Sequence, residues 1–381
     1  MSKTQKIDVK DKDMQGAITR FLKTVLETEE IHAVLAPLRL PMKNTVMPAL
    51  FSDPEKLAEA APLSPSFPLN AAKLVARLTR KPSGQKVAVM LRPCEIRALV
   101  ELVKLKQAHW ENLVVISADC PGAFSNRDYF RYAAEQEPES TDNRFILNGL
   151  AGTRPPIEDI PLMTACRACE HPVPEGADIL IGMIGPDPEK ELMIQARTEA
   201  GEALLEKLNL TDYIEPAGRQ AAVEEWTGRK IAFRDELFQE TRNRTETLDK
   251  LTTYLADCIN CYNCRVACPV CYCKECVFVT DVFNHEPAQY LKWAGRKGVI
   301  KMPTDTVFYH MTRMAHMSLA CVGCGQCANA CPNDVPLLEL FRTVAHQTQA
   351  AFQYQAGRSL DENPPLSVFK ENEYQEVVGI K

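Results

Sequence analysis

Two short cysteine motifs near the C-terminus constrain this chain more than any other feature. Each reads C-x2-C-x2-C-x3-C-P, and the two copies begin at Cys258 and at Cys321. Three thiolates at two-residue gaps can wrap one 4Fe-4S cubane within a tight loop, while the fourth cysteine points to the other cluster. The proline then ends the turn. The motifs therefore predict two cubane clusters in the last third of the chain.

The same pattern predicts that each loop lends its fourth cysteine to the neighbouring cluster. The two expected ligand sets are Cys258, Cys261, Cys264 and Cys331, and Cys321, Cys324, Cys327 and Cys268. Zinc also binds paired C-x2-C motifs, but zinc knuckles supply their four ligands as two pairs. A third C-x2-C step followed by C-P therefore favours the cubane over zinc.

Composition supports metal ligation and argues against several other classes of protein. No apolar run approaches the roughly 18 residues that cross a membrane, and residues 1–14 lack the apolar stretch of a secretory signal. We therefore expect a cytoplasmic protein that reaches a membrane only through a partner. Cytosolic thiols stay reduced, and 15 cysteines, an odd number, cannot all pair as disulfides. Nucleic acid is not expected, because the net charge is −6 and no long basic stripe is present.

The hydrophobic pattern predicts an α/β region ahead of the motifs. Short apolar runs suited to buried strands occupy 86–91, 113–118 and 179–184, and a helical pattern over 95–106 links the first two. A charged helical stretch over 234–256 suits a connector. The expected domains are an N-terminal helical segment at 1–80, an α/β domain with a partly parallel sheet at 81–240, a helical cluster domain at 241–345, and a helix end and tail at 346–381.

The spacer between the motifs predicts the scaffold that holds the clusters. Between Cys268 and Cys321 lie 52 residues, too many for the compact βαββαβ ferredoxin, and they include helical stretches. This arrangement resembles the α-helical ferredoxin module of heterodisulfide reductase and succinate dehydrogenase subunits. We expect His310 and His316, on the helical stretch before the second motif, to pack or lie at the surface rather than bind metal.

Four further cysteines are predicted to meet in the α/β domain. Cys94 and Cys120 each follow a predicted strand, and the strands of a right-handed βαβ unit point the same way, so both cysteines lie at the carboxyl edge of the sheet. That edge is where open α/β sheets build their sites. The pair Cys166 and Cys169 precedes the third strand and could fold over the same edge. A third cubane and buried free cysteines are the two alternatives that spacing leaves open.

Three signatures in this region occur in an order that resembles one family. They are Leu91-Arg-Pro-Cys94, Asp119-Cys120-Pro-Gly122, and Cys166-Arg-Ala-Cys169 followed by the stretch from Ala177 to Gly185. Together they resemble the beta subunits of the coenzyme F-420 hydrogenases and dehydrogenases. With the helical ferredoxin module behind them, the whole chain resembles the beta subunit of methanogen-type formate dehydrogenase, whose bacterial relatives occur beside heterodisulfide-reductase-like proteins.

The resemblance implies cofactors and a role. It implies a cubane held by Cys94, Cys120, Cys166 and Cys169, and FAD in the α/β domain. Candidate flavin contacts are Ser125, Asp178, Gly182 and Gly185, which could equally cap turns or end a strand. A flavin couples two-electron carriers to one-electron clusters. The implied role is an electron-transfer subunit between a catalytic dehydrogenase or hydrogenase subunit and a soluble carrier or heterodisulfide-reductase-like partner.

Some features leave alternatives open. The chain has no G-x-G-x-x-G fingerprint, and Leu91-Arg-Pro stands where many family members have Gly-Thr-Pro or Lys-Pro, so the bound carrier is open. Cys271, Cys273 and Cys276 could hold zinc, replace a ligand, help bind a further cluster or pack as reduced thiols. The rival functions are a flavin-free electron wire, a disulfide-reducing enzyme that uses spare thiols such as Cys273, and a zinc-bearing interaction module. Because no molybdopterin or nickel signature is present, formate or hydrogen chemistry is expected in a partner.

Overall fold

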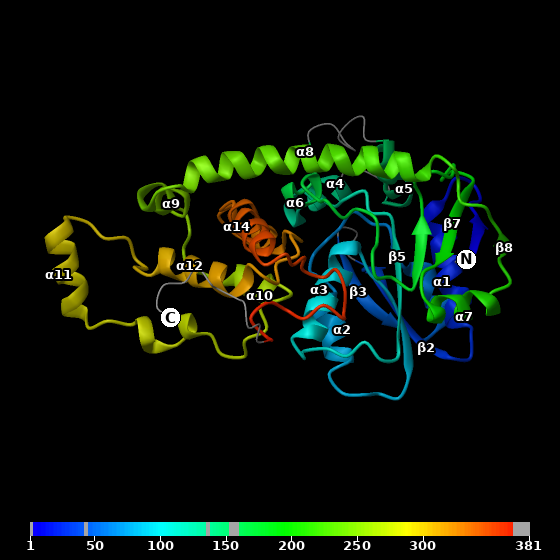
Figure 1. The fold of residues 1–381 in the computed structure, drawn as a ribbon, viewed down its shortest axis with the longest axis horizontal. Coiled ribbons are helices and arrows are strands. Elements are labelled where there is room, and N and C mark those ends of the chain that lie inside the picture. Colours follow the sequence, from blue (N-terminus) through cyan, green and yellow to red (C-terminus); the bar gives the residue numbers. More distant parts are fainter. Residues whose placement is uncertain (1–2, 42–44, 135–137, 152–159, 369–381) are drawn as a thin grey trace.

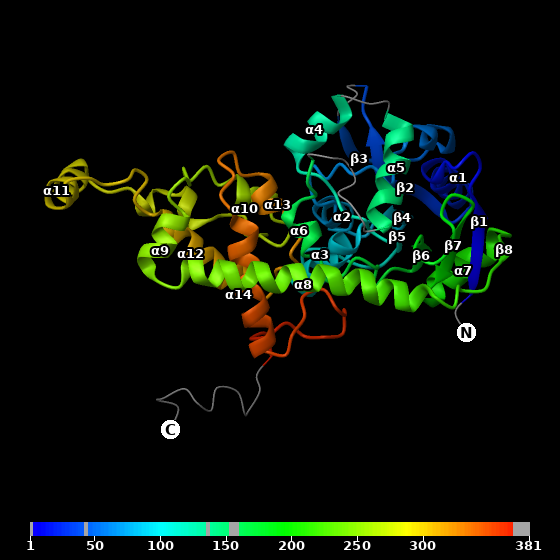
Figure 2. The ribbon, with the colours of Figure 1, turned by 90° about the horizontal axis from the view of Figure 1, so that it is seen from above.

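The computed structural model describes residues 3–41, 45–134, 138–151 and 160–368. A sheet-containing half and a helical half lie side by side, and one long helix, α8 (Arg219–Thr245), runs along both of them (Figures 1 and 2). Within the described ranges, each helix is too short or too polar to span a bilayer.

An eight-stranded mixed sheet forms the centre of the first half. Its strands are β1 (Thr4–Asp8), β2 (Ile31–Arg39), β3 (Val46–Phe51), β4 (Lys86–Met90), β5 (Leu113–Ala118), β6 (Ile179–Gly182), β7 (Glu191–Ala196) and β8 (Thr211–Asp212). They lie in the order β3-β2-β4-β5-β6-β7-β1-β8. The pairs β2·β4, β4·β5 and β5·β6 are parallel, and the outer pairs are antiparallel. The prediction of a partly parallel sheet is confirmed.

Helices cover both faces of the sheet, which explains why its central strand is buried throughout. All six residues of β5 are buried, as expected for a parallel strand between two layers. Val114 belongs to the same buried cluster as Ile18 of α1 and Phe145 of α5, while its neighbour Val115 belongs to the cluster on the opposite face, which contains Leu99 of α3. The helices of this half are α1 (Met14–Leu26), η1 (Pro54–Glu59), α2 (Ala72–Leu78), α3 (Pro93–Lys104), α4 (Asn126–Ala134), α5 (Pro138–Ala151), α6 (Thr164–Arg167) and α7 (Glu199–Lys207).

The first 80 residues differ from the helical segment that we expected. Helix α1 (Met14–Leu26) lies in this stretch, but β1, β2 and β3 lie there as well. Strand β1 pairs with β7, far along the chain, so that Thr4 lies opposite Gln195. Two prolines, Pro37 and Pro48, face each other across the β2–β3 pair and hide the strand pattern, since proline is depleted in strands. Long-range pairing therefore makes strands where the local pattern does not indicate them.

The helical half begins within α8, so the domain boundary expected at residue 240 falls inside this helix. Its elements are α9 (Leu248–Tyr254), α10 (Asn263–Ala267), η2 (Val277–Val279), η3 (Asp281–Phe283), α11 (Pro287–Lys297), α12 (Thr306–Met317), α13 (Gln326–Asn329) and α14 (Leu337–Ala351). Helix α14 packs against α8. Helix α11 has no buried residue and projects from the end of this half (Figures 1 and 2).

The chain after α14 returns to the sheet-containing half and binds α3. The phenol of Tyr354 donates to Glu101 at 2.6 Å, and the backbone N–H of Gly357 donates to the same carboxylate at 2.7 Å. Arg97 donates to the carbonyl oxygen of Ala356 at 2.7 Å. Tyr354, Ala356 and Gly357, in the stretch expected to hold the helix end and tail, are therefore buried, whereas residues 358–368 are exposed or half-buried. Residues 369–381 lie outside the described residues.

Candidate metal centres

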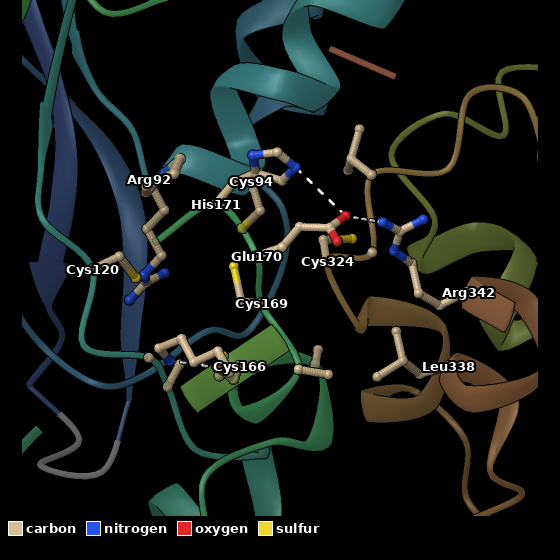
Figure 3. A pocket seen from close by; sticks show the side chains of 18 of the residues that line it. Arg92, Cys94, Cys120, Cys166, Cys169, Glu170, His171, Cys324, Leu338 and Arg342 are labelled. Carbon is tan, nitrogen blue, oxygen red and sulfur yellow. Dashed lines mark hydrogen bonds and ion pairs between the residues drawn. The ribbon is translucent and has the colours of Figure 1, made fainter. Parts of the chain in front are cut away.

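The four cysteines predicted to meet in the α/β domain line one cavity between the two halves (Figure 3). Cys94 is the second residue of α3, and Cys120 follows β5. Cys166 lies in α6 and Cys169 just after it. We call these four residues the inner site. A fifth cysteine, Cys324 from the second motif, lines the same cavity.

A buried carboxylate fixes the start of α3 and with it Cys94. Glu95, 4% exposed, accepts hydrogen bonds from the backbone N–H of Arg92 at 2.8 Å and of Ala71 at 2.7 Å. These donors belong to groups at helix starts that have no partner inside the helix. Burial raises the pKa of Glu95. The helix that carries Cys94 is thus joined to the start of α2.

A second buried carboxylate holds the sheet edge beside Cys120. Asp119 forms a two-point ion pair with Arg219, at 2.7 and 2.9 Å, and accepts from the backbone N–H groups of Met183 and Ile184. Arg219 is the first residue of α8. The long helix is therefore anchored at the strand end that carries Cys120.

The segment after Cys169 joins the sheet half to both long helices. Glu170 pairs with Arg234 of α8 and with Arg342 of α14, and lies 3.5 Å from His171. Figure 3 shows Glu170 between His171 and Arg342. Neighbouring positive charges hold the pKa of Glu170 well below its usual range despite its burial.

The chemistry of the inner site fits an anionic cluster. Arg92, Arg97, Lys230 and Arg342 also line the cavity, and Lys230 donates to the carbonyl oxygen of Cys166 at 2.7 Å. Burial raises the pKa of the Cys166 thiol to about 12, and the thiols of Cys120 and Cys169 add to this effect. The four thiols line one cavity. Iron bound there would favour their deprotonated form. Among the described residues, no three His, Cys, Asp or Glu side chains converge on a single ion, so the group is defined by its shared cavity.

The two C-terminal motifs fold into matching loops. Asn260 and Gly323, one residue before the second cysteine of each motif, have φ of 50° and 71°. Tyr262 and Gly325, one residue after it, have φ of 62° and 78°. These left-handed residues turn the chain back on itself. Helices α10 and α13 then begin at the same motif position and pack against each other.

The thiols that lie near each other are those that are required if each loop gives its fourth cysteine to the other loop's cluster. We call Cys321, Cys324, Cys327 and Cys268 the middle site, and Cys258, Cys261, Cys264 and Cys331 the outer site. Burial raises the pKa of Cys268 to about 11, and Cys321 of the other loop raises it further. Burial also raises the pKa of Cys258, and Cys331 contributes from the second loop. The ligand sets themselves stay a prediction.

Three side chains of α12 reach the outer site, and the sequence did not identify them as site residues. The guanidinium of Arg313 donates to Cys264 Sγ at 3.0 Å, and the phenol oxygen of Tyr309 lies 3.5 Å from the same sulfur. His310 Nε2 lies 3.2 Å from Cys258 Sγ. His310 is fully buried, whereas His316 is exposed. The sequence showed that Tyr309 and Arg313 are four positions apart on one helix and so share a face, with His310 between them. It did not show their partners, because the cysteines that they contact lie about 50 residues earlier.

The four candidate flavin contacts do not surround a common cavity among the described residues. Ser125 hydrogen-bonds Asp128 at the start of α4. The carboxylate of Asp178 accepts from the backbone of Val115 and from Thr198, at the edge of the sheet opposite the cysteines. Gly182 and Gly185 adjoin Arg219 instead: a Cβ on Gly182 would lie 2.6 Å from Met193, and one on Gly185 would lie 2.9 Å from Cβ of Arg219. These four residues therefore lie at three separate places in the fold.

Of the remaining three cysteines, Cys271 packs in one cluster with Cys268 and Cys324 of the middle site, and Cys276 packs in another with Cys258 and Cys264 of the outer site. Cys273 is exposed, whereas Cys271 and Cys276 are half-buried. Burial raises the pKa of Cys271, with smaller contributions from the thiols of Cys273 and Cys276. The three thiols are therefore neighbours of one another.

Comparisons with known proteins confirm the family resemblance. The family model for the C terminus of the coenzyme F420 hydrogenase/dehydrogenase beta subunit matches residues 84–220, and that of a 4Fe-4S binding domain matches residues 317–336. The F420-dependent formate dehydrogenase subunit beta of Methanocaldococcus jannaschii is 27% identical over 373 residues, covering 92% of this chain and 93% of the relative. Subunit beta of the F420-dependent formate dehydrogenase 1 of Methanococcus maripaludis is 25% identical, covering 92% of both chains.

A search of solved structures finds a similar chain in the xenon-derivatised F420-reducing nickel–iron hydrogenase complex of Methanosarcina barkeri. It is 16% identical, with a TM-score of 0.44, and the match covers 65% of this chain and 94% of that one.

Proposed function

We propose that this chain is a beta subunit of the coenzyme F420 hydrogenase/dehydrogenase type, whose C-terminal family model matches residues 84–220, and that it conducts electrons through three 4Fe-4S clusters, at the inner, middle and outer sites. The donor is a catalytic dehydrogenase or hydrogenase subunit. The acceptor is a soluble carrier or a heterodisulfide-reductase-like protein in the cytoplasm. Formate or hydrogen chemistry belongs to the catalytic partner.

One observation carries this proposal: thiols from both halves of the chain share a cavity. Cys94, Cys166 and Cys324 pack in one apolar cluster with Phe67 and Leu338. The inner and middle sites are thus adjacent, and the exchanged cysteines Cys268 and Cys331 link the middle and outer sites in the same way. When bound, iron–sulfur clusters supply one-electron redox chemistry with potentials between roughly −700 and +450 mV.

The residues of this chain bind, enclose and charge-balance the three sites. Cysteines supply the thiolates, and the apolar side chains around Cys94 and Cys324 exclude water. Cations such as Arg92 and Lys230 offset the negative charge of a thiolate-bound group in the inner site. The outer site lies at the other end of the series of three sites, and its Cys261 is exposed, so that electrons can enter or leave at the protein surface.

The more specific proposal, that the chain also binds FAD, is supported by the resemblance to the family. A flavin would let the chain accept electron pairs from a two-electron carrier. A flavin-free electron wire is the second candidate, and it is favoured by the finding that Ser125, Asp178, Gly182 and Gly185 do not gather around one cavity. Flavin released on denaturation of anaerobically purified chain would support the first candidate, and its absence would support the wire.

Iron content per chain tests the main proposal. Three cubanes predict about 12 iron atoms per chain. About eight would confine clusters to the two C-terminal motifs, and zinc in place of iron would overturn the proposal.

A further inference from the structure

Helix α12 brings a buried positive charge between the two C-terminal sites. Arg313 is 5% exposed, and its two terminal nitrogens contact Cys264, at 3.0 Å from the sulfur and 3.2 Å from the carbonyl oxygen. Its guanidinium carbon lies 4.6 Å from the ring centroid of Phe341 and 5.6 Å from that of Tyr309. A buried cation is costly unless a negative group compensates it.

Thiols provide that compensation. The thiols of Cys264, Cys268 and Cys327 all lie close enough to act electrostatically on the guanidinium of Arg313. Cys264 belongs to the outer site, whereas Cys268 and Cys327 belong to the middle site. The cation therefore acts on both sites, but its direct hydrogen bond goes to the outer one.

Two further side chains strengthen the bias toward the outer site. Tyr309, fully buried, has its phenol oxygen 3.5 Å from Cys264 Sγ, and the ring of His310 lies 3.2 Å from Cys258 Sγ. Among the described residues, no arginine or lysine side chain donates a hydrogen bond to a sulfur of the middle site, whereas Arg313 donates one to Cys264 of the outer site.

Hydrogen bonds and positive charge at the sulfur ligands stabilise the reduced, more negative state of a cluster and raise its potential. We propose that Arg313, supported by Tyr309 and His310, makes the outer site the more easily reduced of the two C-terminal sites. One electron then leaves the reduced middle site and is accepted at the oxidised outer site, beside exposed Cys261. This inference rests on the proposed function, because it concerns clusters bound at these sites.

The test is a redox titration of the full chain, purified without oxygen, followed by electron paramagnetic resonance. A Cys261→Ser variant perturbs the outer signal and so assigns it. In Arg313→Gln we expect the outer cluster to be at least about tenfold harder to reduce, a fall of 59 mV for a one-electron step, with a smaller fall at the middle site. Arg313→Lys, which keeps the charge, recovers part of the shift.

Two further variants separate tuning from folding. Tyr309→Phe removes only the hydroxyl and should lower the outer potential by less than Arg313→Gln does, at full iron content. Arg39→Gln is the matched control, because Arg39 is also ion-paired, with Asp142 at 2.6 Å, but lies on β2, away from the cysteines. It should leave both potentials unchanged.

The results of these experiments test the proposed function and the role of Arg313 separately. Wild-type chain without clusters would overturn the proposed function. Clusters with an outer potential below the middle one, or unchanged in both Arg313→Gln and Tyr309→Phe, would overturn only the present inference. If Arg313→Gln loses iron, Tyr309→Phe and Arg313→Lys decide.

Discussion

Cys94 of the sheet half and Cys324 of the helical half line the same cavity and pack against the same apolar residues. The first starts a helix after β4, and the second lies in a loop of the last motif. Under the proposed function, their meeting makes the interface between the halves part of the electron path. Residues that hold the halves together should therefore affect iron binding as well as stability.

The first prediction concerns the inner site. Cys94→Ser should lower the iron content from about 12 to about eight atoms per chain, because a serine hydroxyl is a poor replacement for a thiolate at one cluster. The matched control is Cys273→Ser, at an exposed cysteine outside the three sites, which should keep about 12. A loss of iron in the control would make Cys273 a ligand and refute the ligand sets.

The second prediction concerns the link between the halves. Glu170→Gln leaves Arg234 and Arg342 without their carboxylate, and breaking such a buried pair costs about 3 kcal/mol of unfolding free energy; this low value suits a side chain that is 15% exposed. Urea midpoints at equal iron content measure the change. Glu240→Gln, which breaks an exposed pair with Arg244, should cost below about 1 kcal/mol.

The third prediction concerns the sheet edge at Cys120. Asp119→Asn removes the charge that pairs with Arg219 while both side chains are buried, so we expect a loss of about 3–5 kcal/mol and a lower iron content at the inner site. Combined with Arg219→Gln, the two losses should be less than additive. Additive losses would show that the pair is not a unit. Asp187→Asn, at an exposed pair with Lys190, is the control.

The fourth prediction concerns iron removal. The loops of the middle and outer sites contain only α10 and α13, of five and four residues, and such short helices are not stable alone. Anaerobic chelation should therefore raise hydrogen exchange over 258–276 and 321–336, because metal binding is coupled to folding. Strands β4 and β5 should stay protected. Equal exchange gains in both halves would contradict this expectation.

Much of the sheet half could be read from local pattern. The strands β4, β5 and β6 and the helix α3 begin within two residues of the predicted ranges, because continuous apolar runs and a helical apolar face are local signals. The meeting of Cys94 and Cys120 followed from topology, since parallel strands end at the same edge. Strands β1 to β3 were missed because their pairing partners, not their own patterns, make them strands.

The environment of the sulfurs could not be read in the same way. Arg313 and His310 act through contacts with Cys264 and Cys258, which come from another loop, so only the folded chain brings them together. Asp178, Gly182 and Gly185, the candidate cofactor contacts, serve the hydrogen bonding of β5 and the close packing of Arg219 in the folded chain. Local sequence indicates which residues can do chemistry, but long-range packing decides which of them meet.

The projecting helix α11 offers a point at which the protein could be attached to an electrode. Its exposed amines, Lys292 and Lys297, could be joined by amide bonds to a carboxylate-coated electrode without disturbing a packed core. The chain returns from this helix to the outer site at Lys301, which donates to the carbonyl oxygen of Cys258 at 2.6 Å. Attachment through α11 would turn the outer site toward the electrode. Electron transfer through the cluster proposed there could then be measured directly as a current.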